Sequence, residues 1–368
     1  MKVKVYYGPH SYFDSYLPKN ELKLTLLEFI KQYDGLTKGI IKQEDINSYD
    51  FFAVTSDEYG GTTDAFIEMM LLVILNYQEI FEYDEIYLHN PPSKVYSQLS
   101  KYEDFEIEEF NYIYPKVSRE VLRVIKVNYD EKILGQKNAK KEILQALYSL
   151  VNNNKGKPKV IMLYGPPGIG KTETAQFINE ILTKQGALFR KQFSMFHNHS
   201  FFEYIFGDRS NSFAKDLMDR ESNVVLLDEF DKCNSLFFSA FYQLFDEGFY
   251  EDKYYKVNMK DSIIICTSNY ASEDEIKNNL GEAIFSRFDA FVEFHLLSEE
   301  VKRIIIDRIY EEELKFYVEE DKQLVLNFIF NGKNIPELLK TRSKNLSNVR
   351  EIRRYVKKMI ANPIIENL

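Results

Sequence analysis

The middle of the chain alternates short apolar runs with longer segments whose apolar residues recur at helical spacing. The runs at 160–164, 224–227 and 263–267 are rich in Val, Ile and Leu, a composition typical of strands that are buried on both faces. Segments 138–150 and 172–182 place apolar residues three or four positions apart, which predicts helices. Buried strands that alternate with helices predict a parallel sheet covered by helices, which is an α/β fold.

The two ends of the chain carry different patterns. Up to residue 127, strand-like segments alternate with helix-like segments. The strand-like segments are 3–7, 51–55, 85–89 and 105–114, and the helix-like segments are 21–33 and 63–81. After residue 297 the patterns are helical, at 299–318, 322–330 and 349–360. We therefore expect a separate N-terminal α/β domain over 1–127, a central core over 128–296 and a helical part over 297–368.

Composition excludes several classes of protein. A formal net charge of −10 and a pI near 5.3 argue against a general nucleic-acid coating protein, whose affinity rests on Lys and Arg at phosphates. The two cysteines, Cys233 and Cys266, lie far apart and indicate neither a disulfide framework nor a cysteine zinc site. The longest apolar stretch, 66–75, is interrupted by Glu68 and is too short to cross a bilayer. Because the N-terminus lacks a signal-peptide pattern, we expect a cytoplasmic protein without a membrane partner.

A glycine-rich octapeptide joins the apolar run at 160–164 to the helix predicted at 172–182. Its sequence, Gly-Pro-Pro-Gly-Ile-Gly-Lys-Thr, has the spacing of a phosphate-binding loop. Glycines let backbone N–H groups converge on a phosphate, and the positive end of the following helix adds to the attraction. We expect Lys171 to reach the β- and γ-phosphates and Thr172 to place its hydroxyl on Mg²⁺. The loop comprises Gly165, Pro166, Pro167, Gly168, Ile169, Gly170, Lys171 and Thr172.

Polar residues follow two other buried strands. Asp228 and Glu229 come directly after the run at 224–227, and Asn269 comes just after the run at 263–267. Because the carboxyl ends of parallel strands share one edge of the sheet, we expect these side chains beside the phosphate loop. Asp228 would hold the Mg²⁺ shell, Glu229 would polarise the attacking water, and Asn269 would orient that water near the γ-phosphate.

In this order the motifs resemble those of the AAA+ ATPases, and in particular the carboxyl-terminal ATPase module of the Clp-type unfoldases and disaggregases. The resemblance covers about residues 133–368. It implies a P-loop AAA+ core with a parallel sheet flanked by helices, a large ATPase subdomain over 128–296 and a helical lid over 297–368. Besides the phosphate loop, the motifs that carry it are Ile133-Leu134-Gly135-Gln136, Asp228-Glu229-Phe230-Asp231-Lys232, Gln243-Leu244-Phe245-Asp246-Glu247-Gly248 and Thr267-Ser268-Asn269.

The resemblance also implies roles that spacing alone does not give. Arg287, in Phe-Ser-Arg-Phe-Asp, looks like the arginine finger that acts on the nucleotide of a neighbouring subunit. Arg350 looks like the sensor-2 arginine, which acts within its own subunit from the lid. Ile133 and Leu134 would wall the adenine pocket. The implied activity is Mg²⁺-dependent hydrolysis of ATP to ADP and phosphate by a homo-oligomeric ring, usually a hexamer, with ATP and Mg²⁺ as cofactors.

One family motif is missing. The Clp-type unfoldases grip polypeptide with an aromatic pore loop, typically Gly-Tyr-Val-Gly, between the phosphate-loop helix and the acidic strand. The corresponding region, 206–214, offers only Phe213 as a gripping residue. Two interpretations therefore stay open: a chaperone-like ATPase that remodels a protein client recruited by the N-terminal domain, and an ATP-dependent switch or scaffold for a partner effector, for example in genome defence or a DNA transaction. A third is a nucleotide-binding module without turnover.

Overall fold

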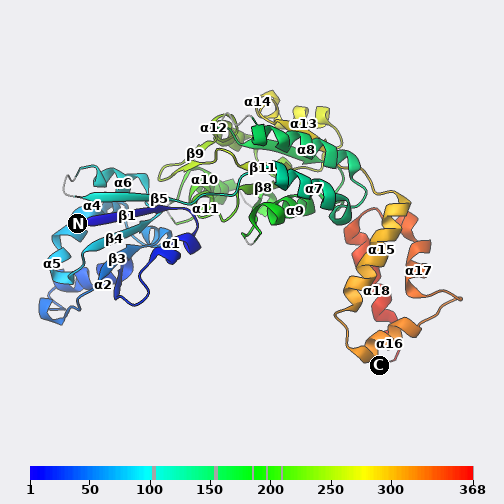
Figure 1. Ribbon diagram of the computed structural model, residues 1–368, viewed down its shortest axis with the longest axis horizontal. Coiled ribbons are helices and arrows are strands. Elements are labelled where there is room, and N and C mark those ends of the chain that lie inside the picture. Colours follow the sequence, from blue (N-terminus) through cyan, green and yellow to red (C-terminus); the bar gives the residue numbers. More distant parts are fainter. Residues whose placement is uncertain (102–104, 153–155, 185, 196–197, 209, 368) are drawn as a thin grey trace.

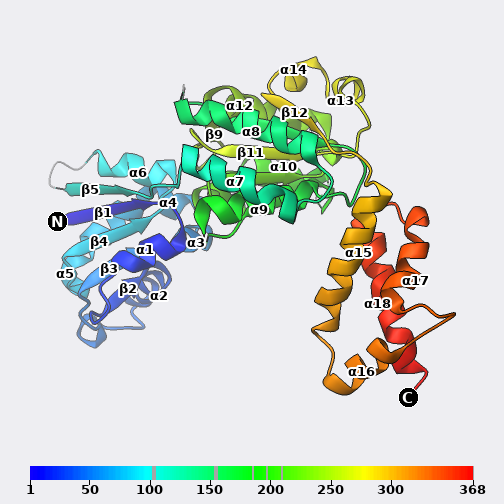
Figure 2. The same ribbon diagram turned by 45° about the vertical axis from the view of Figure 1, so that its right-hand side comes forward.

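The structure is a computed structural model that describes residues 1–101, 105–152, 156–184, 186–195, 198–208 and 210–367. The chain forms three parts that follow one another in space as they do in sequence (Figures 1 and 2). A parallel sheet forms the N-terminal part, a second parallel sheet forms the middle, and a group of helices projects from the far side of the second sheet. The fold class predicted from the sequence, an α/β core with a separate N-terminal α/β domain and a C-terminal helical lid, is confirmed.

The N-terminal domain is built on a parallel sheet with the strand order β2-β3-β4-β1-β5. Its strands are β1 (Lys2–Tyr7), β2 (Lys23–Thr25), β3 (Phe51–Val54), β4 (Glu85–His89) and β5 (Glu106–Asn111). Its helices are α1 (His10–Tyr16), α2 (Leu26–Thr37), α3 (Ser56–Gly60), α4 (Asp64–Asn76), α5 (Gln78–Phe81) and α6 (Ser93–Leu99). Because successive strand residues point to opposite faces, Val3 and Val5 pack with α2, α4 and α6, whereas Tyr6 packs with Phe13 of α1. Helices therefore cover both faces of this sheet.

The central part is a second parallel sheet, in the order β12-β6-β11-β8-β7, with a β9–β10 antiparallel hairpin at its side. Its strands are β6 (Lys159–Tyr164), β7 (Phe189–Gln192), β8 (Val224–Asp228), β9 (Phe249–Glu251), β10 (Lys256–Asn258), β11 (Ile263–Thr267) and β12 (Ala290–Glu293). Its helices are α7 (Arg119–Lys132), α8 (Lys137–Asn152), α9 (Lys171–Thr183), α10 (Asn198–Phe206), α11 (Phe213–Met218), α12 (Tyr242–Glu247), α13 (Glu273–Leu280) and α14 (Glu282–Phe285).

The inner strands of the central sheet are buried on both faces, as their continuous apolar runs predict. Ile161, Leu226 and Ile265 pack into the layer formed by α7, α8 and α9. Val160 and Cys266 pack into an aromatic layer contributed by α10, α11 and α12. Since β6, β8 and β11 run parallel and adjacent, their carboxyl ends meet at one edge of the sheet.

The helical part consists of α15 (Glu299–Leu314), α16 (Glu319–Asn327), α17 (Ile335–Thr341) and α18 (Val349–Ile365). Ile306 of α15 and Val356 of α18 are fully buried where these helices pack together. Arg353 of α18 forms an ion pair with Glu313 of α15 at 2.7 Å. In the part of the chain that the structure describes, no helix is both long and apolar enough to span a bilayer.

Several elements differ from the boundaries that the sequence pattern predicts, and two of these differences concern β2 and α7. Residues 23–25, predicted as the start of a helix, form the edge strand β2, and α2 begins only after Thr25 caps it by accepting a hydrogen bond from the Glu28 N–H (3.2 Å). Helix α7 runs across the predicted domain limit at 127. Its buried residues Ile125 and Tyr129 belong to the core that also contains α9. The limits at 127 and 296 stay predictions.

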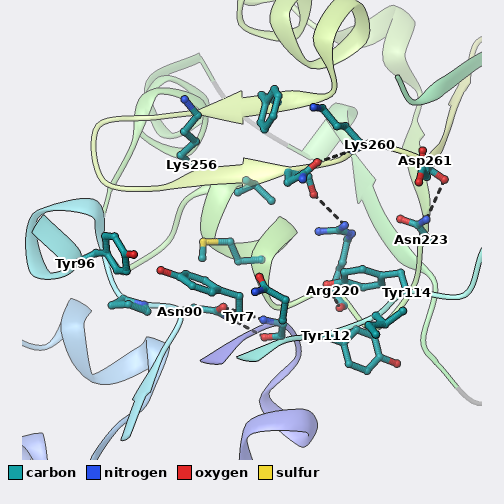
Figure 3. Close-up of a pocket in the computed structure, with 18 of the residues that line it drawn as sticks. Tyr7, Asn90, Tyr96, Tyr112, Tyr114, Arg220, Asn223, Lys256, Lys260 and Asp261 are labelled. Carbon is teal, nitrogen blue, oxygen red and sulfur yellow. Dashed lines mark hydrogen bonds between the residues drawn. The ribbon is translucent and has the colours of Figure 1, made fainter. Parts of the chain in front are cut away.

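The N-terminal domain packs against the central part with the carboxyl edge of its sheet. Around the ends of β1, β4 and β5 lie residues that precede β8 and residues of the β9–β10 hairpin, with a pocket of about 830 Å³ between them (Figure 3). The Tyr114 hydroxyl donates a hydrogen bond to the Arg220 carbonyl (3.0 Å), and the Arg220 guanidinium lies 4.0 Å from the centroid of the Tyr114 ring. These contacts join the two domains at one side of the pocket.

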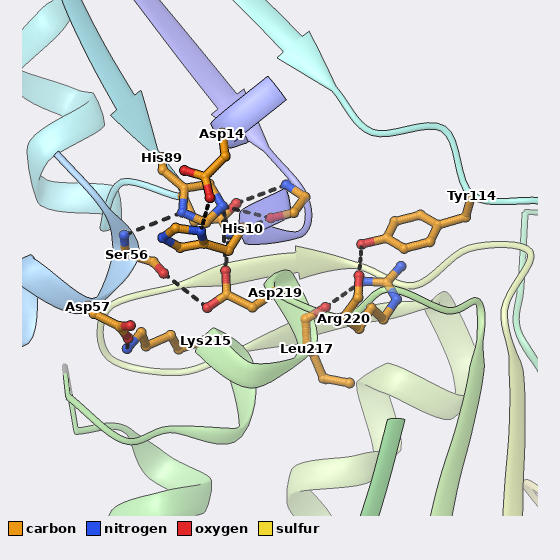
Figure 4. Close-up of polar contacts among 12 residues, drawn as sticks. His10, Asp14, Ser56, Asp57, His89, Tyr114, Lys215, Leu217, Asp219 and Arg220 are labelled. Atoms are coloured by element: carbon orange, nitrogen blue, oxygen red, sulfur yellow. Dashed lines mark hydrogen bonds and ion pairs between the residues drawn. The ribbon is translucent and has the colours of Figure 1, made fainter. Parts of the chain in front are cut away.

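A polar cluster joins the two domains beside this pocket (Figure 4). Asp219 of the central part accepts hydrogen bonds from Ser56 Oγ (3.0 Å) and Asn90 Nδ2 (2.5 Å). His89 Nε2 lies 3.6 Å from the Asp219 carboxylate and 2.8 Å from the Gly8 carbonyl. Burial raises the pKa of Asp219 to about 6 and lowers the pKa of His89 to about 4. At neutral pH, His89 is therefore uncharged, and the ionised Asp219 is held by donors of the N-terminal domain.

Candidate nucleotide-binding site

The glycine-rich octapeptide forms a tight turn between β6 and α9. Gly165, Gly168 and Gly170 have positive φ angles of 123°, 72° and 112°, which side chains rarely adopt. A Cβ at Gly165 would lie 2.2 Å from the Phe294 carbonyl oxygen, so no larger residue fits there. Gly170 is the N-cap of α9, which leaves the first N–H groups of that helix without helical acceptors. The turn is therefore a backbone concavity with the shape and polarity of a phosphate cradle.

Lys171 stands at the start of α9 and is buried, with 8% of its surface exposed. Its ammonium group donates hydrogen bonds to the carbonyl oxygens of Gly165 (2.6 Å) and Pro166 (2.7 Å) and to Asn269 Oδ1 (3.2 Å). Burial lowers the pKa of Lys171 to about 8, although nearby carboxylates act in the opposite direction. The structure thus brings together Lys171 and Asn269, which the sequence analysis placed at the same edge of the sheet.

Hydroxyl groups converge on Asp228 at the carboxyl end of β8. The Thr267 hydroxyl donates to Asp228 Oδ1 at 2.6 Å, and Thr172 Oγ1 lies 3.4 Å from the same oxygen. The Glu229 N–H donates in turn to the Thr267 hydroxyl at 2.9 Å. A hydroxyl and a carboxylate oxygen at this distance can bind one hard cation, and Mg²⁺ prefers such ligands. The pair Thr172 and Asp228 fits the predicted magnesium site.

Sequence reasoning missed Arg190, which binds the same carboxylate. Arg190 lies on β7, and its Nε and Nη2 both donate to Asp228 Oδ2, at 3.0 and 2.5 Å. β7 pairs in parallel with β8, with Gln192 opposite Asp228 and Arg190 opposite Leu226. A basic residue on a strand next to the acidic strand is the one signal that the sequence offers for this pair. Asp228 therefore already has a cationic partner within the protein.

Glu229 follows Asp228 and leaves the strand with a left-handed backbone, at a φ of 55°. The Gln192 amide donates to Glu229 Oε2 at 3.0 Å. Hydrogen bonds from Ser194 and Gln192 lower the pKa of Glu229, so its carboxylate is ionised at neutral pH. Because Glu229 also lines the pocket described below, the side chain is placed to accept a hydrogen bond from a water.

The helical part contacts the glycine-rich turn directly. The Val349 N–H donates to the Gly168 carbonyl at 2.9 Å. Asn348 caps α18 by accepting from the Glu351 N–H at 3.0 Å, and its side chain also lies against Gly168. Arg350, in the first turn of α18, is exposed and lines the same pocket as the turn. The start of α18 therefore connects the lid to the phosphate cradle.

These groups surround a pocket of about 710 Å³, a volume that suits a nucleotide. The site residues predicted from the sequence that line it are Ile133, Leu134, Pro167, Gly168, Ile169, Gly170, Lys171, Thr172, Asp228, Glu229, Asn269 and Arg350. Gly165 and Pro166 do not line the pocket, but their carbonyl oxygens accept hydrogen bonds from the Lys171 ammonium group. Lining residues that sequence reasoning missed include Arg190, Gln192, Thr267, Arg308 and Arg353.

Arg287 is the one predicted site residue that the structure places away from this pocket. Its Nε donates to Asp246 Oδ2 at 2.8 Å, and its guanidinium lies 4.0 Å from the centroid of the Tyr242 ring. About a quarter of the side chain, 24%, is exposed. Arg287 thus does not reach the nucleotide site of its own chain, a position compatible with action on a neighbouring subunit.

Comparison with known proteins relates this geometry to a family. Residues 157–312 match the family model described as the AAA domain (Cdc48 subfamily). The chaperone protein ClpB of Malacoplasma penetrans is 24% identical over 282 residues, which cover 70% of this chain and 39% of the relative. These matches support a Clp-type AAA+ ATPase module in this chain. The resemblance noted in the sequence is therefore confirmed for this AAA+ module.

Two further relatives match parts of the chain. ClpB of Chlamydia muridarum is 30% identical over 168 residues, which cover 42% of this chain and 19% of the relative. The ATP-binding subunit ClpL of the ATP-dependent Clp protease from Staphylococcus aureus is 26% identical over 218 residues, which cover 52% of this chain and 31% of the relative. The chain thus spans 39% or less of the length of these curated relatives.

A solved structure with a similar fold is the closed-state cryo-EM reconstruction of Hsp104 with ATPγS and FITC casein. The TM-score is 0.55 at 13% sequence identity, and the match covers 100% of this chain and 89% of that chain. At this identity, the likeness concerns the fold alone.

The region that corresponds to the Clp pore loop is largely exposed up to Asn211, among the residues described, and is buried from Ser212 to Ala214. Of residues 206–214, the structure describes all but 209. Phe213, the gripping residue that the sequence offered, has 0% exposure, and its ring meets that of Tyr250 edge-on with centroids 4.9 Å apart. The Phe213 ring is therefore part of the aromatic core and is not exposed to grip a polypeptide.

Proposed function

We propose that the protein binds ATP with Mg²⁺ in the pocket of the AAA+ module, hydrolyses it to ADP and phosphate, and uses this cycle to remodel a protein client recruited by its N-terminal domain. The observation that carries the proposal is the meeting of Lys171 with Asn269, beside Thr172 and Asp228, at the ends of three adjacent strands. Phosphoryl transfer depends mainly on positioning and charge stabilisation, which such a cluster supplies.

Binding of the phosphates would replace contacts that the protein now makes with itself. The Lys171 ammonium donates to two carbonyls of its own loop, and phosphate oxygens are stronger acceptors for the same protons. Thr172 and Asp228 would hold Mg²⁺, which supplies positive charge to the phosphate oxygens when bound. Arg190 would have to release Asp228, or share it, since it donates twice to one carboxylate oxygen. Ile133 and Leu134 would contact the adenine.

Glu229 is the proposed base for hydrolysis. Its lowered pKa keeps the carboxylate ionised, so it can accept a hydrogen bond from a water and align that water for in-line attack. Asn269 would fix the same water from the neighbouring strand. Arg350 would bring positive charge from the lid to the γ-phosphate, where negative charge develops in the transition state.

Two substitutions test this assignment of roles. Glu229→Gln retains a polar side chain but removes the base, so we expect ATP turnover to fall by about 100-fold or more while ATP still binds. Lys171→Ala removes the buried ammonium group, so we expect binding itself to be lost. Phosphate release and calorimetric ATP binding should be measured on the same preparations. Equal turnover in Glu229→Gln and the wild type would contradict the assignment.

We also propose that the active protein is a homo-oligomeric ring of six subunits, as the family resemblance implies. The position of Arg287 supports this arrangement, because its partners Asp246 and Tyr242 hold it outside the pocket of its own chain. Mass measurement with and without ATP tests the ring directly. An ATP-dependent species of six subunits is expected, and a monomer under all conditions would contradict the proposal.

A second function, an ATP-dependent switch or scaffold for a partner effector, is favoured by the packing of the region that replaces the pore loop. Lys215, which directly follows this region, forms an ion pair with Asp57 of the N-terminal domain at 2.5 Å. A Cβ at Gly60 of that domain would lie 2.7 Å from the Ser210 Cα, so the two backbones touch. Because these contacts fix the region against the N-terminal domain, it is better suited to transmit a movement between the domains than to grip a client polypeptide that moves past it.

FITC-casein distinguishes the two functions. A remodelling enzyme should hydrolyse ATP faster in the presence of casein, and its Glu229→Gln variant should retain casein when loaded with ATP. A switch should hydrolyse ATP at the same rate with and without casein and should retain none. Anisotropy of the labelled casein and phosphate release, measured in one cuvette, give both results.

A further inference from the structure

The pocket between the two domains lies at a particular place in the N-terminal sheet. β1 and β4 are neighbours, and the helices that follow them, α1 and α6, cover opposite faces of the sheet. Such a switch point leaves a crevice between the two loops, which is the usual place for a ligand in an open parallel sheet. The loop after β1 contributes Gly8 to the pocket, and the loop after β4 contributes Asn90 (Figure 3). The pocket volume of about 830 Å³ suits a ligand of nucleotide size.

The AAA+ module contributes a buried positive charge to this pocket. Arg220 is only 5% exposed, and its guanidinium donates to the carbonyls of Leu217 (2.6 Å) and Asn258 (3.3 Å). Within the ranges that the structure describes, no carboxylate pairs with Arg220 and no acceptor reaches its Nε. A buried cation without an anionic partner is costly, so Arg220 would gain from an anionic ligand.

Lysines extend this positive charge towards solvent. Lys256 at the start of β10 and Lys260 shortly after it are both exposed, and both line the pocket. Lys256 has a partly compensating partner in Glu251 at 3.3 Å. Asp261 also lines the pocket, but its carboxylate is paired with Lys116 at 2.7 Å. Positive charge therefore exceeds negative charge along this side of the pocket.

Other lining side chains are aromatic or carry amide groups. Tyr7, Tyr96 and Tyr112 line the pocket, and the ring centroids of Tyr7 and Tyr96 are 6.5 Å apart. Asn90 and Asn223 add amides, and Asn223 Oδ1 is buried without a hydrogen-bond partner among the residues described. Aromatic rings stack on nucleic acid bases, and amides form hydrogen bonds with base edges.

We propose that this pocket binds a nucleoside phosphate, with the phosphate near Arg220 and Lys260 and the base against the tyrosines. The phosphate would give Arg220 the anion that it lacks. The ligand would contact both domains and hold the N-terminal domain against the AAA+ module. The site is distinct from the pocket at the phosphate loop, because the two pockets share no lining residue.

Nucleoside monophosphates are the probes of choice, because they lack the β- and γ-phosphates that Lys171 would bind. We expect AMP or GMP to bind the full chain at about one molecule per chain in isothermal titration calorimetry, at least about tenfold more tightly than inorganic phosphate. The same binding should persist in Lys171→Ala. Loss of binding in Lys171→Ala would place the nucleotide at the phosphate loop and overturn the proposal, as would the absence of saturable binding for both nucleotides.

Charge reversal at the rim locates the ligand. Lys260→Glu should weaken nucleotide binding about tenfold or more, because a repulsive charge replaces one that faces the phosphate. Lys333→Glu makes the same change at an exposed position in the helical part and should leave the affinity unchanged. Equal affinities for the two variants, or phosphate binding as tight as that of the nucleotides, would overturn the proposal. Neither result would affect the assignment of the phosphate loop, because ATP binding there is measured separately.

Discussion

Arg190 donates two hydrogen bonds, at 3.0 and 2.5 Å, to a single carboxylate oxygen of Asp228. The Asp228 side chain is 7% exposed and that of Arg190 is 45% exposed. The arginine therefore compensates a nearly buried negative charge from the solvent side of the pocket. Since the proposed magnesium site uses the same carboxylate, the ion pair and Mg²⁺ compete for Asp228.

This competition predicts a change in the magnesium requirement. In Arg190→Gln, we expect half-maximal ATP turnover at a Mg²⁺ concentration about two- to fivefold lower, because an ion pair with a half-exposed partner contributes no more than about 1 kcal/mol. Magnesium titration of phosphate release measures the shift. Lys191→Gln is a matched control on the same strand, since Lys191 pairs with Asp216 at 2.5 Å instead. An unchanged or higher requirement in Arg190→Gln would show that the two cations do not compete.

The burial of Phe213 predicts a loss of stability on truncation. Phe213→Ala should lower the free energy of unfolding by about 3–5 kcal/mol, because it leaves a cavity in the aromatic core around Tyr250. Phe206→Ala, at a neighbouring aromatic residue that is 40% exposed, should cost about 1 kcal/mol or less. Denaturant unfolding followed by circular dichroism measures both. A Phe213→Ala protein as stable as the wild type would argue that the ring leaves the core in solution.

The polar cluster between the domains predicts a particular dependence on pH. His89 has a lowered pKa, so its contribution to stability is present above its ordinary value of 6.5 and is lost as the pH falls towards about 4. Asp219 has a raised pKa, so its contribution is present below its ordinary value of 3.8 and is lost as the pH rises through about 6. Between pH 7 and pH 5 the two contributions therefore oppose each other. The other titratable groups beside them are common to the variants compared below, and they are Lys215, Asp57, Asp14 and His10.

Asp219→Asn removes one of these opposing contributions. On acidification from pH 7 to pH 5, we expect the variant to lose about 1 kcal/mol more unfolding free energy than the wild type, since the contribution of His89 is no longer offset. Urea unfolding at the two pH values measures the difference. Asp34→Asn, at a carboxylate that is 53% exposed, should follow the wild type. Parallel pH profiles for Asp219→Asn and the wild type would contradict the opposing pKa shifts.

Much of the nucleotide site could be predicted because its residues follow strands that are buried on both faces. Continuous apolar runs located β6, β8 and β11, and the rule for parallel strands then placed Asp228 and Asn269 at the same edge as Lys171. β7 could not be predicted in this way, because Phe-Arg-Lys-Gln is short, partly exposed and lacks an apolar run. The ion pair of Arg190 depends on the register of that strand and so escaped prediction.

Contacts between the domains also lay beyond the sequence patterns. Asn90 and Asp219 are far apart in the chain, and each follows a segment whose own pattern predicts only a local element. Their hydrogen bond depends on how the surfaces of the two folded domains fit together. The periodicity of apolar residues along the sequence does not encode that fit. The strand β2 was missed for a related reason, since three residues paired with the neighbouring β3 are too few to show alternation.

Mixing two inactive variants tests directly whether a neighbouring subunit completes each nucleotide site. Glu229→Gln lacks the proposed base but should still bind ATP, and Arg287→Ala lacks the arginine that lies outside the nucleotide pocket. Each variant alone should have almost no ATP turnover. Equimolar mixing before ATP is added should restore about a quarter of the wild-type rate, because random assembly places an intact Glu229 beside an intact Arg287 at one interface in four. If the mixture were as inactive as its components, or if Arg287→Ala alone hydrolysed ATP at the full rate, the proposal that two subunits share each nucleotide site would be contradicted.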